Sequence, residues 1–276
     1  MPELPEVETI VRDLRPLLVG RTIVAVTHAD WPNTIAPLAP DAFAAAVSGE
    51  QITDVTRRAK YILLHLASGR VLSVHLRMTG ALTFRATPQP PGRATRLIFT
   101  LTGPAELHFT DARKFGKVRL LEPGERIAFE TALGPEPLPD DFTVARFAAL
   151  LAGRRAQLKP LLLNQAVLAG LGNIYADEAL WQARLHPLRL AAGLTPDEIA
   201  RLYTAIRAVL QQGLANRGTS VDTYRDARGE KGRNQEALAA YGRRDQPCPR
   251  CGTPIVRLVV GGRGTHICPR CQVLAP

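Results

Sequence analysis

The stretch CPRCGTPIVRLVVGGRGTHICPRC, residues 248–271, holds all four cysteines of the 276-residue chain in two CPRC motifs. Sixteen residues separate the two motifs. Two close cysteine pairs at such a separation can bring four thiolates to one tetrahedral Zn²⁺. The runs IVRLVV and THIC flank the glycine-rich GGRG, which predicts a β-hairpin between the pairs. The predicted zinc ligands are Cys248, Cys251, Cys268 and Cys271.

Two disulfides or a redox dithiol are the alternative interpretations of these cysteines. The amino-terminal MPELPEVETI is acidic and has no apolar core segment, so we predict no signal peptide and a cytoplasmic location in a cell without organelles. Disulfides are rare in that compartment, and a redox dithiol needs only one pair. We therefore expect one structural zinc ion, because four cysteine ligands leave no open position for a catalytic water.

The composition is that of a folded protein with a basic surface. Hydrophobic residues make up 46% and charged residues 22% of the chain. There are 35 Lys and Arg against 25 Asp and Glu, a formal net charge of +10, which favours a polyanionic partner such as nucleic acid. A generally basic, solvated surface is the alternative. No apolar run approaches the roughly 18 residues of a membrane span, so we expect no membrane partner.

The first half of the chain combines a helix with β-strands. Apolar periodicity predicts a helix over 5–18. Short β-like runs separated by turn residues follow: TIVAVT, YILLHL, VLSVHL, RLIFTL, ELHFTD and KVRLLE. This spacing favours a β-sandwich or barrel, with a mixed sheet as the alternative and the strand order open.

The second half of the chain is predicted to be helical. The segment LGPEPLPDD, residues 133–141, is rich in Pro and Gly, which predicts a linker. Helices are predicted after it over 143–152, 155–169 and 174–183. The sequence TPDE at 195–198 is a capping box that begins a further helix, ending near residue 216. Residues 217–231 are polar and contain glycine, which predicts a loop. The expected domains are 1–135, 136–240 and 241–276.

The amino terminus raises a chemical question. Acids near the start of a helix are commonly explained by capping and the helix dipole. If Met1 is removed, however, Pro2 becomes a free secondary amine that can attack an electrophilic carbon such as a sugar C1′ and form an iminium. An α-amine with a pKa near 8 is neutral in about one molecule in ten at pH 7, against about one in 2,500 for lysine. Glu3 is placed to move protons beside that nitrogen. If Met1 is retained, the nitrogen is an unreactive amide.

Seven motifs occur together and in order along nearly the whole chain. They are PELPEVET, RRAKY, HLRMTG, DARKFG, LGPEPL, GLGNIYADE and the four-cysteine hairpin. In this combination the chain resembles the bacterial formamidopyrimidine-DNA glycosylases, which remove 8-oxoguanine. The resemblance implies an α+β multidomain fold: an N-terminal β-sandwich with a flanking helix, a helical domain with a helix–two-turn–helix element, and a zinc-finger hairpin.

The resemblance also implies an activity. The expected enzyme excises oxidised purines, such as 8-oxoguanine and formamidopyrimidines, from damaged double-stranded DNA and then cleaves the abasic site by β- and δ-elimination. It needs no nucleotide cofactor, is a monomer and acts at the nucleoid. By position, Pro2 is the nucleophile, Glu3 the acid–base group and Glu6 its support. Lys60 in RRAKY contacts a phosphate beside the damaged nucleotide. A solvated lysine at a strand end is the alternative for Lys60.

Six further residues correspond to DNA-binding positions of the family. Met78, Arg113 and Phe115 resemble a void-filling trio, because an extruded nucleotide leaves a hole and an unpaired base. A flexible thioether fills such a hole, an aromatic ring wedges between base pairs, and Arg113 faces the orphaned cytosine. Asn173 is expected to bind phosphate through backbone N–H groups at a helix start. Lys159 would face the damaged strand, and Arg263 would reach a phosphate from the hairpin tip.

Two positions depart from the family pattern. Asp222 stands where members often carry a basic residue, and Asn234 stands near a common aromatic position. A relative specialised for oxidised pyrimidines, similar to endonuclease VIII, is one alternative, although its members begin with PEGPE and this chain has PELPE. A non-catalytic DNA-binding zinc protein is the other.

Overall fold

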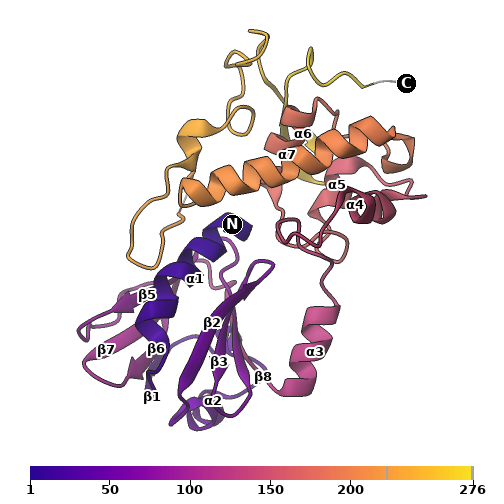
Figure 1. Ribbon diagram of the computed structural model, residues 1–276. Helices are drawn as coiled ribbons and strands as arrows, with labels where there is room; N and C mark the ends of the chain where they lie inside the picture. Colours follow the sequence, from indigo (N-terminus) through magenta and orange to yellow (C-terminus); the bar gives the residue numbers. More distant parts are fainter. Residues whose placement is uncertain (222, 275–276) are drawn as a thin grey trace. The chain divides into compact units, whose positions relative to one another are not determined.

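The computed structural model describes residues 1–221 and 223–274. The chain forms two compact units, whose elements are drawn in Figure 1. The first unit consists of Met1–Thr131 and Asn216–Arg233, and the second of Ala132–Ala215 and Asn234–Pro276. The segment 216–233 therefore belongs with the amino-terminal half of the chain. The division into three domains expected from the sequence stays a prediction. No helix in the described ranges is both long and apolar enough to cross a membrane.

Two four-stranded antiparallel sheets build the first unit. The first sheet has the order β1 (Ile23–Ala29), β6 (Thr95–Leu101), β7 (Ala105–Asp111) and β5 (Gly80–Arg85). The second has the order β2 (Ile52–Arg58), β3 (Tyr61–Leu66), β4 (Val71–His75) and β8 (Lys117–Leu121). The helices of this unit are α1 (Leu4–Leu18), α2 (Pro40–Val47) and α3 (Pro123–Thr131), with a short 3-10 helix η1 (Pro32–Thr34).

Both sheets and α1 share one apolar core. Ile10 of α1, Phe99 and Leu107 of the first sheet, and Ile62 and Val74 of the second are all 1% exposed or less and lie in the same cluster. Apolar residues three and four apart on α1 form one buried face, as helical periodicity requires. Two sheets that enclose a common core form a sandwich. The predicted β-sandwich with a flanking helix is therefore confirmed.

The sequence-based prediction missed the strands β2 and β5. Strand β2 mixes polar with apolar residues and ends in Arg57 and Arg58, so its apolar run is short. Strand β5 begins at Gly80, a residue that usually indicates a turn. A Cβ at Gly80 would lie 2.3 Å from the carbonyl oxygen of Leu76, so glycine is required there by a close backbone approach. The helices α2 and α3 were also not predicted.

The second unit is helical and ends in a β-hairpin. Its elements are α4 (Val144–Leu151), α5 (Leu158–Leu163), α6 (Asn173–Ala183), η2 (Ala191–Gly193), α7 (Pro196–Ala215), η3 (Asn234–Ala237), β9 (Val256–Val260) and β10 (Arg263–Ile267). Helix α6 packs on α7 at Gly213, where a Cβ would meet the Tyr175 hydroxyl at 2.5 Å. The predicted capping box is confirmed: Thr195 Oγ1 accepts the Glu198 N–H at 3.3 Å, and the Glu198 carboxylate accepts the Thr195 N–H at 2.9 Å.

The prediction of one helix over 155–169 was wrong in its extent. Helix α5 begins at Leu158 and ends at Leu163. The side-chain oxygen of Asn164 then accepts the Ala166 N–H at 3.0 Å. Asparagine side chains compete in this way with the helical hydrogen bonds of the backbone. Residues 164–169 are consequently in turns, although their Ala- and Leu-rich composition is that of a helix.

Truncation of the core between the sheets should destabilise the first unit strongly. Phe99 is 1% exposed, and its ring lies 6.2 Å from that of Phe43. We expect Phe99→Ala to lower the free energy of unfolding by about 3–5 kcal/mol, since it removes buried apolar contacts and leaves a cavity. Denaturant titration measures this change. Val24→Ala, at a side chain 53% exposed on β1, should change it by no more than about 0.5 kcal/mol.

Candidate active site and zinc centre

The amino-terminal end of α1 gathers three of the predicted catalytic residues. Pro2 is buried, and Glu3 is the N-cap residue of the helix. Glu6 Oε2 accepts the Glu3 N–H at 2.8 Å and closes a capping box with that residue. The two acids are 2% and 1% exposed. A helix N-terminus favours negative charge, and this end of α1 places both acids near Pro2 in the chain.

Lys60 lies in the turn between β2 and β3 and is 5% exposed, which excludes a solvated strand-end lysine. The preceding Ala59 has a φ of 54°, a left-handed conformation that tightens the turn. His75 is also buried, and its Nδ1 accepts the Arg77 N–H at 3.0 Å. Burial, together with the nearby Arg77 and Lys60 cations, lowers the pKa of His75 to about 3. His75 is therefore neutral at pH 7.

Arg113 and Phe115 of the predicted trio are brought together on the loop between β7 and β8. The guanidinium carbon of Arg113 lies 5.0 Å from the centroid of the Phe115 ring. Phe115 is 52% exposed, which is unusual for a large aromatic side chain. Met78 is half-buried in the turn before β5. The neighbouring Thr79 connects the two segments, because its hydroxyl accepts the Arg113 N–H at 3.2 Å.

Asp111 organises this loop, although the sequence analysis did not single it out. Its Oδ1 accepts the Thr79 hydroxyl and the Arg113 N–H, the latter at 3.1 Å. Its Oδ2 accepts the N–H groups of Phe115 and Gly116, each at 2.7 Å. Asp111 is 1% exposed. An aspartate at the start of a turn that contains glycine is a recognisable signal, because such carboxylates cap the backbone that follows them.

Two predicted phosphate-binding residues lie in the second unit. Asn173 is the first residue of α6, where backbone N–H groups have no helical partner. Its side-chain Nδ2 donates to the Gly264 carbonyl at 3.1 Å. Arg263 is exposed and begins β10 directly after Gly261 and Gly262, whose φ angles are 55° and 73°. Two successive residues with positive φ suit a tight hairpin turn, so the turn presents Arg263 to solvent.

Lys159 lies inside the second unit and not on its surface. Its side chain is 0% exposed. Its Nζ donates to Asp177 Oδ1 at 2.5 Å, Thr265 Oγ1 at 2.8 Å and the Gly264 carbonyl at 3.1 Å. The sequence predicted that Lys159 faces a DNA strand, whereas its ammonium is buried within the second unit. Lys159 instead joins α5 to α6 and to the hairpin that carries Arg263. Sequence analysis could not identify Asp177, because its partners are distant in the chain.

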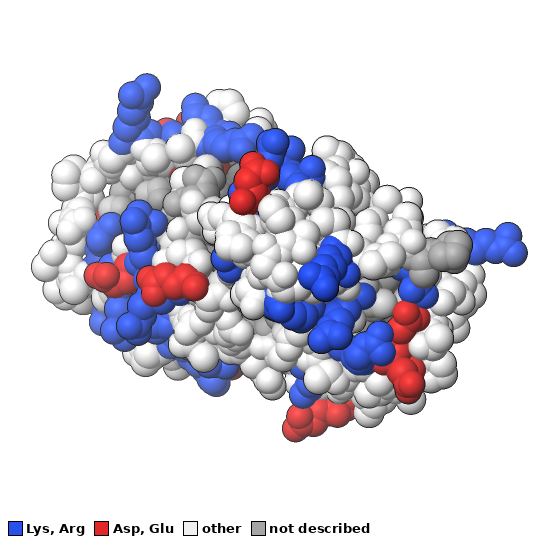
Figure 2. Space-filling model, turned by 90° about the horizontal axis from the view of Figure 1, so that it is seen from above, with Lys and Arg blue, Asp and Glu red and all other residues white. Residues whose placement is uncertain are grey.

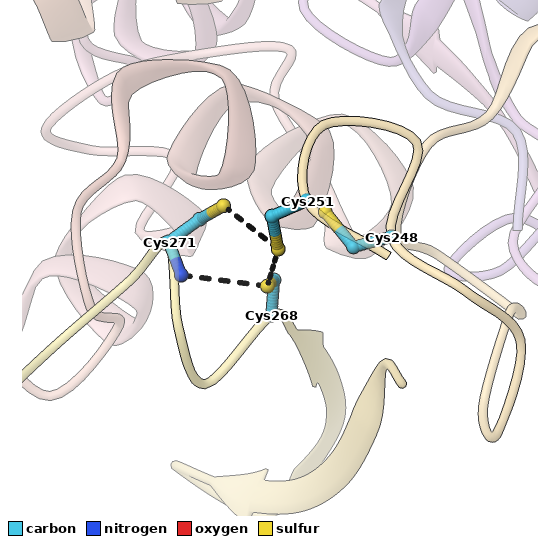
Figure 3. Close-up of side chains that lie close together, drawn as sticks. All are labelled: Cys248, Cys251, Cys268 and Cys271. Carbon is cyan, nitrogen blue, oxygen red and sulfur yellow. Dashed lines mark hydrogen bonds between the residues drawn. The ribbon is translucent and has the colours of Figure 1, made fainter. Parts of the chain in front are cut away.

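The four cysteine side chains point toward one another (Figure 3). Their sulfur atoms all lie within 4.8 Å of one another. Cys251 Sγ is 3.4 Å from Cys268 Sγ and 3.5 Å from Cys271 Sγ. Zinc–sulfur bonds of about 2.3 Å in a tetrahedron place sulfur atoms roughly 3.8 Å apart. The donor set and its spacing therefore fit one zinc ion.

The zinc centre has a tryptophan neighbour that the sequence did not indicate. Trp181 Nε1 donates to Cys248 Sγ at 3.4 Å. The guanidinium carbon of Arg250, between the first two cysteines, lies 4.1 Å from the centroid of the Trp181 ring. Hydrogen bonds to ligand atoms orient them and reduce their charge. Trp181 on α6 is thus placed to support the metal site from outside the hairpin.

Comparison with known proteins places the chain in a family. The model for the formamidopyrimidine-DNA glycosylase N-terminal domain matches residues 1–118. That for the H2TH domain of the same glycosylase matches 133–225, and that for a zinc finger found in FPG and IleRS matches 245–273. The chain belongs to the formamidopyrimidine-DNA glycosylase family. With this membership, the helical domain and the zinc finger predicted from the sequence are confirmed, and the four cysteines form the site of one structural zinc ion.

Relatives in this family match the chain from end to end. The formamidopyrimidine-DNA glycosylase of Herpetosiphon aurantiacus is 51% identical over 272 residues, covering 99% of this chain and 100% of the relative. That of Roseiflexus sp. is 49% identical with the same coverage. A solved complex of Lactococcus lactis Fpg with DNA containing an abasic site has a TM-score of 0.92 at 34% identity, covering 99% of this chain and 100% of that one.

The two positions that depart from the family pattern differ in what the structure describes. Asp222 lies outside the described residues. Asn234 begins η3 and is 2% exposed, so its amide is part of the interior of the second unit. The buried carboxylate of Glu178 on α6 accepts the N–H groups of Ala239, Ala240 and Tyr241, which follow η3, at 2.7–2.8 Å.

Loss of one cysteine should remove the metal. We expect Cys248→Ser to lower the zinc content from about one ion per chain to near zero, because four thiolates close the tetrahedral site. Elemental analysis of the purified protein measures this content. Trp181→Phe keeps all four ligands and loses only the N–H···S bond. It should retain zinc but release it faster to a chelator, and an unchanged release rate would show that this bond is unimportant.

The neutral state of His75 should make stability depend on pH. An unfolded histidine has a pKa near 6.5, whereas the pKa of His75 in the fold is lowered to about 3. Between these values the unfolded chain binds a proton that the folded chain does not. The free energy of unfolding should therefore fall as the pH is lowered from 6.5 toward 3. His75→Asn, which keeps an acceptor for Arg77, should flatten this dependence in chemical denaturation. Parallel curves of unfolding free energy against pH for the two proteins would contradict this prediction.

Proposed function

We propose that this chain excises oxidised purines, including 8-oxoguanine and formamidopyrimidines, from duplex DNA and then cleaves the strand at the abasic site. The observation that carries the proposal is the buried start of α1, where Pro2 adjoins the buried acids Glu3 and Glu6. Family membership and solved relatives bound to damaged DNA support it. The protein acts as a monomer at the nucleoid in the bacterial cytoplasm, without a nucleotide cofactor.

The reaction begins with processing of the chain. Removal of Met1 frees the Pro2 nitrogen, whose lone pair attacks C1′ of the damaged nucleotide. The electron pair of the glycosidic bond leaves with the base, which takes up a proton. The Pro2 nitrogen then loses its proton, and its lone pair opens the C1′–O4′ bond as O4′ takes up a proton, which gives a cationic iminium between Pro2 and C1′. Loss of a C2′ proton expels the 3′ phosphate, a second elimination expels the 5′ phosphate, and water releases Pro2.

Each catalytic residue has a part in these steps that its position supports. Glu3 adjoins the nucleophile in the chain and transfers the protons. Glu6 fixes Glu3 through the N–H bond of 2.8 Å, so that the reacting nitrogen has one position. Lys60 supplies positive charge from the turn between β2 and β3, beside a histidine that is neutral at pH 7. Because Lys60 is buried, it acts at short range on a phosphate of the extruded nucleotide.

The loop held by Asp111 replaces the extruded nucleotide. Removal of a base from the stack costs a few kcal/mol, which the inserted side chains partly offset. Phe115, exposed beside Arg113, wedges between base pairs. Arg113 donates to the acceptors of the orphaned cytosine, and Met78 fills the remaining space. Asp111 keeps the loop backbone in one conformation, so these side chains are ordered before DNA binds.

The second unit contributes phosphate contacts. Backbone N–H groups at Asn173 face the DNA from the start of α6. Arg263 reaches a phosphate from the hairpin turn, and zinc keeps that hairpin rigid. We assign Lys159 an indirect role, since its ammonium fixes the same hairpin from inside. Lys and Arg side chains gather in several patches on the face shown in Figure 2, which suits a polyanionic partner.

Loss of the proline amine should abolish excision but keep binding. Pro2→Gly replaces the secondary amine with a primary one that lacks the ring, and we expect the single-turnover excision of 8-oxoguanine to fall at least about 100-fold. Binding to the same duplex should change by less than about threefold, because the phosphate contacts remain. Gel assays of base release and of binding measure the two quantities.

Borohydride reduction provides the direct test of the iminium. Wild-type protein whose Met1 has been shown by mass analysis to be absent should give a covalent adduct with DNA that carries 8-oxoguanine. No adduct from such protein would favour a DNA-binding module without catalysis. Faster turnover of thymine glycol than of 8-oxoguanine would instead assign the enzyme to oxidised pyrimidines.

A further inference from the structure

Residues 216–233 form a loop whose two ends meet. The Arg233 N–H donates to the Asn216 carbonyl at 2.9 Å. Gly232 crosses Gly218 so closely that a Cβ on Gly232 would lie 2.1 Å from the Gly218 oxygen. Within the loop, the Asp226 N–H donates to the Glu230 carbonyl at 2.9 Å. The described residues of this segment thus make a compact loop with its own internal bonds.

A guanidinium clamp attaches this loop to α1. Arg217 Nη2 donates to Asp13 Oδ2 at 2.6 Å and to Asp226 Oδ2 at 2.5 Å. The side chains of the two aspartates are 5% and 2% exposed, whereas that of Arg217 is 40% exposed. Arg228, 69% exposed and 4.0 Å from Asp13, is a weaker second cation. Buried carboxylates are costly without a close cation. Arg217 is therefore what allows the two acids to lie together.

The loop backbone that follows Arg217 packs on the catalytic end of α1. Thr219, two residues beyond Arg217, donates its N–H to Glu6 Oε1 at 2.7 Å. A Cβ on Gly218 would lie 2.9 Å from Glu6 Cγ, so the backbone packs directly on that side chain. The buried Tyr224 hydroxyl donates to the Arg217 carbonyl at 3.2 Å. The loop backbone is thereby joined, through Glu6, to the residue that follows Pro2.

We propose that Arg217 is a positioning residue that determines whether the enzyme can use the base of its substrate. The proposal rests on the function proposed above. A base attached to C1′ must lie near Pro2 when the nitrogen attacks, and the loop backbone at 218–219 lies beside the same helix turn. Binding to a loop that is already ordered avoids the entropy cost of ordering it. An abasic deoxyribose has no base, so its cleavage needs the Glu6–Glu3 hydrogen bond of 2.8 Å within α1 but not an ordered loop.

The test compares two substrates with one pair of matched variants. Arg217→Gln removes the clamp cation from the loop. Arg15→Gln removes an equal charge from α1, at an exposed pair with Asp54. We expect Arg217→Gln to lower the single-turnover excision of 8-oxoguanine at least tenfold and to change the cleavage of an abasic duplex by less than threefold. Arg15→Gln should change neither rate by more than twofold. The tenfold loss exceeds the effect of an isolated surface ion pair.

Equal losses on both substrates, or no loss on either, would overturn the proposal. If Arg217→Gln does not fold, Arg217→Lys decides, because it keeps a cation between the aspartates but can make fewer bonds. It should lower only base excision, by about three- to tenfold, and an equal fall in abasic cleavage would contradict the positioning role. Wild-type protein inactive on both duplexes would instead reject the proposed glycosylase function.

Discussion

The candidate active site of the first unit depends on the hydrogen bonds that the Glu6 carboxylate accepts. One oxygen accepts the Glu3 N–H at 2.8 Å and the other accepts the Thr219 N–H at 2.7 Å. The residue is 1% exposed, so an oxygen without a donor would carry a large desolvation cost. Both the start of α1 and the loop 216–233 must therefore meet this side chain. The site is assembled by satisfying one buried acid.

In the second unit, a buried acid likewise joins separate segments of the chain through its hydrogen bonds. Asp177 accepts the Lys159 ammonium at 2.5 Å and the His266 N–H at 2.9 Å, and it is 1% exposed. Removal of either charge would leave the other buried without its partner, which is strongly destabilising. The hairpin is thus fixed at the zinc end by four thiolates and along β10 by this ion pair. In the proposed function, this rigid support gives Arg263 at its tip one position from which to meet a phosphate.

Exposed side chains with a proposed role in DNA binding lie close to buried acids in this protein. Arg113 and Phe115 project from a loop whose backbone N–H groups converge on the 1% exposed Asp111. Loops that bind DNA lie on the surface, where few apolar contacts can order them. A buried carboxylate that accepts several N–H groups orders the loop backbone, while the side chains at the tip of the loop stay exposed. The same arrangement, with Asp226 and the Arg217 clamp, holds the loop on α1.

The sequence by itself determined the features that depend on neighbouring residues. The amphipathic α1 and the Thr195 capping box are set by spacings of three to four residues, and the zinc site by two close cysteine pairs sixteen residues apart. The ordered motifs identified the family. Only the tertiary structure decided which polar residues are buried. Arg217 and Asp13 are 204 positions apart. Lys159 was predicted to face the damaged DNA strand, whereas its ammonium donates to Asp177 and Thr265 inside the second unit. The burial of a charge depends on partners that only folding brings together, so local sequence cannot specify it.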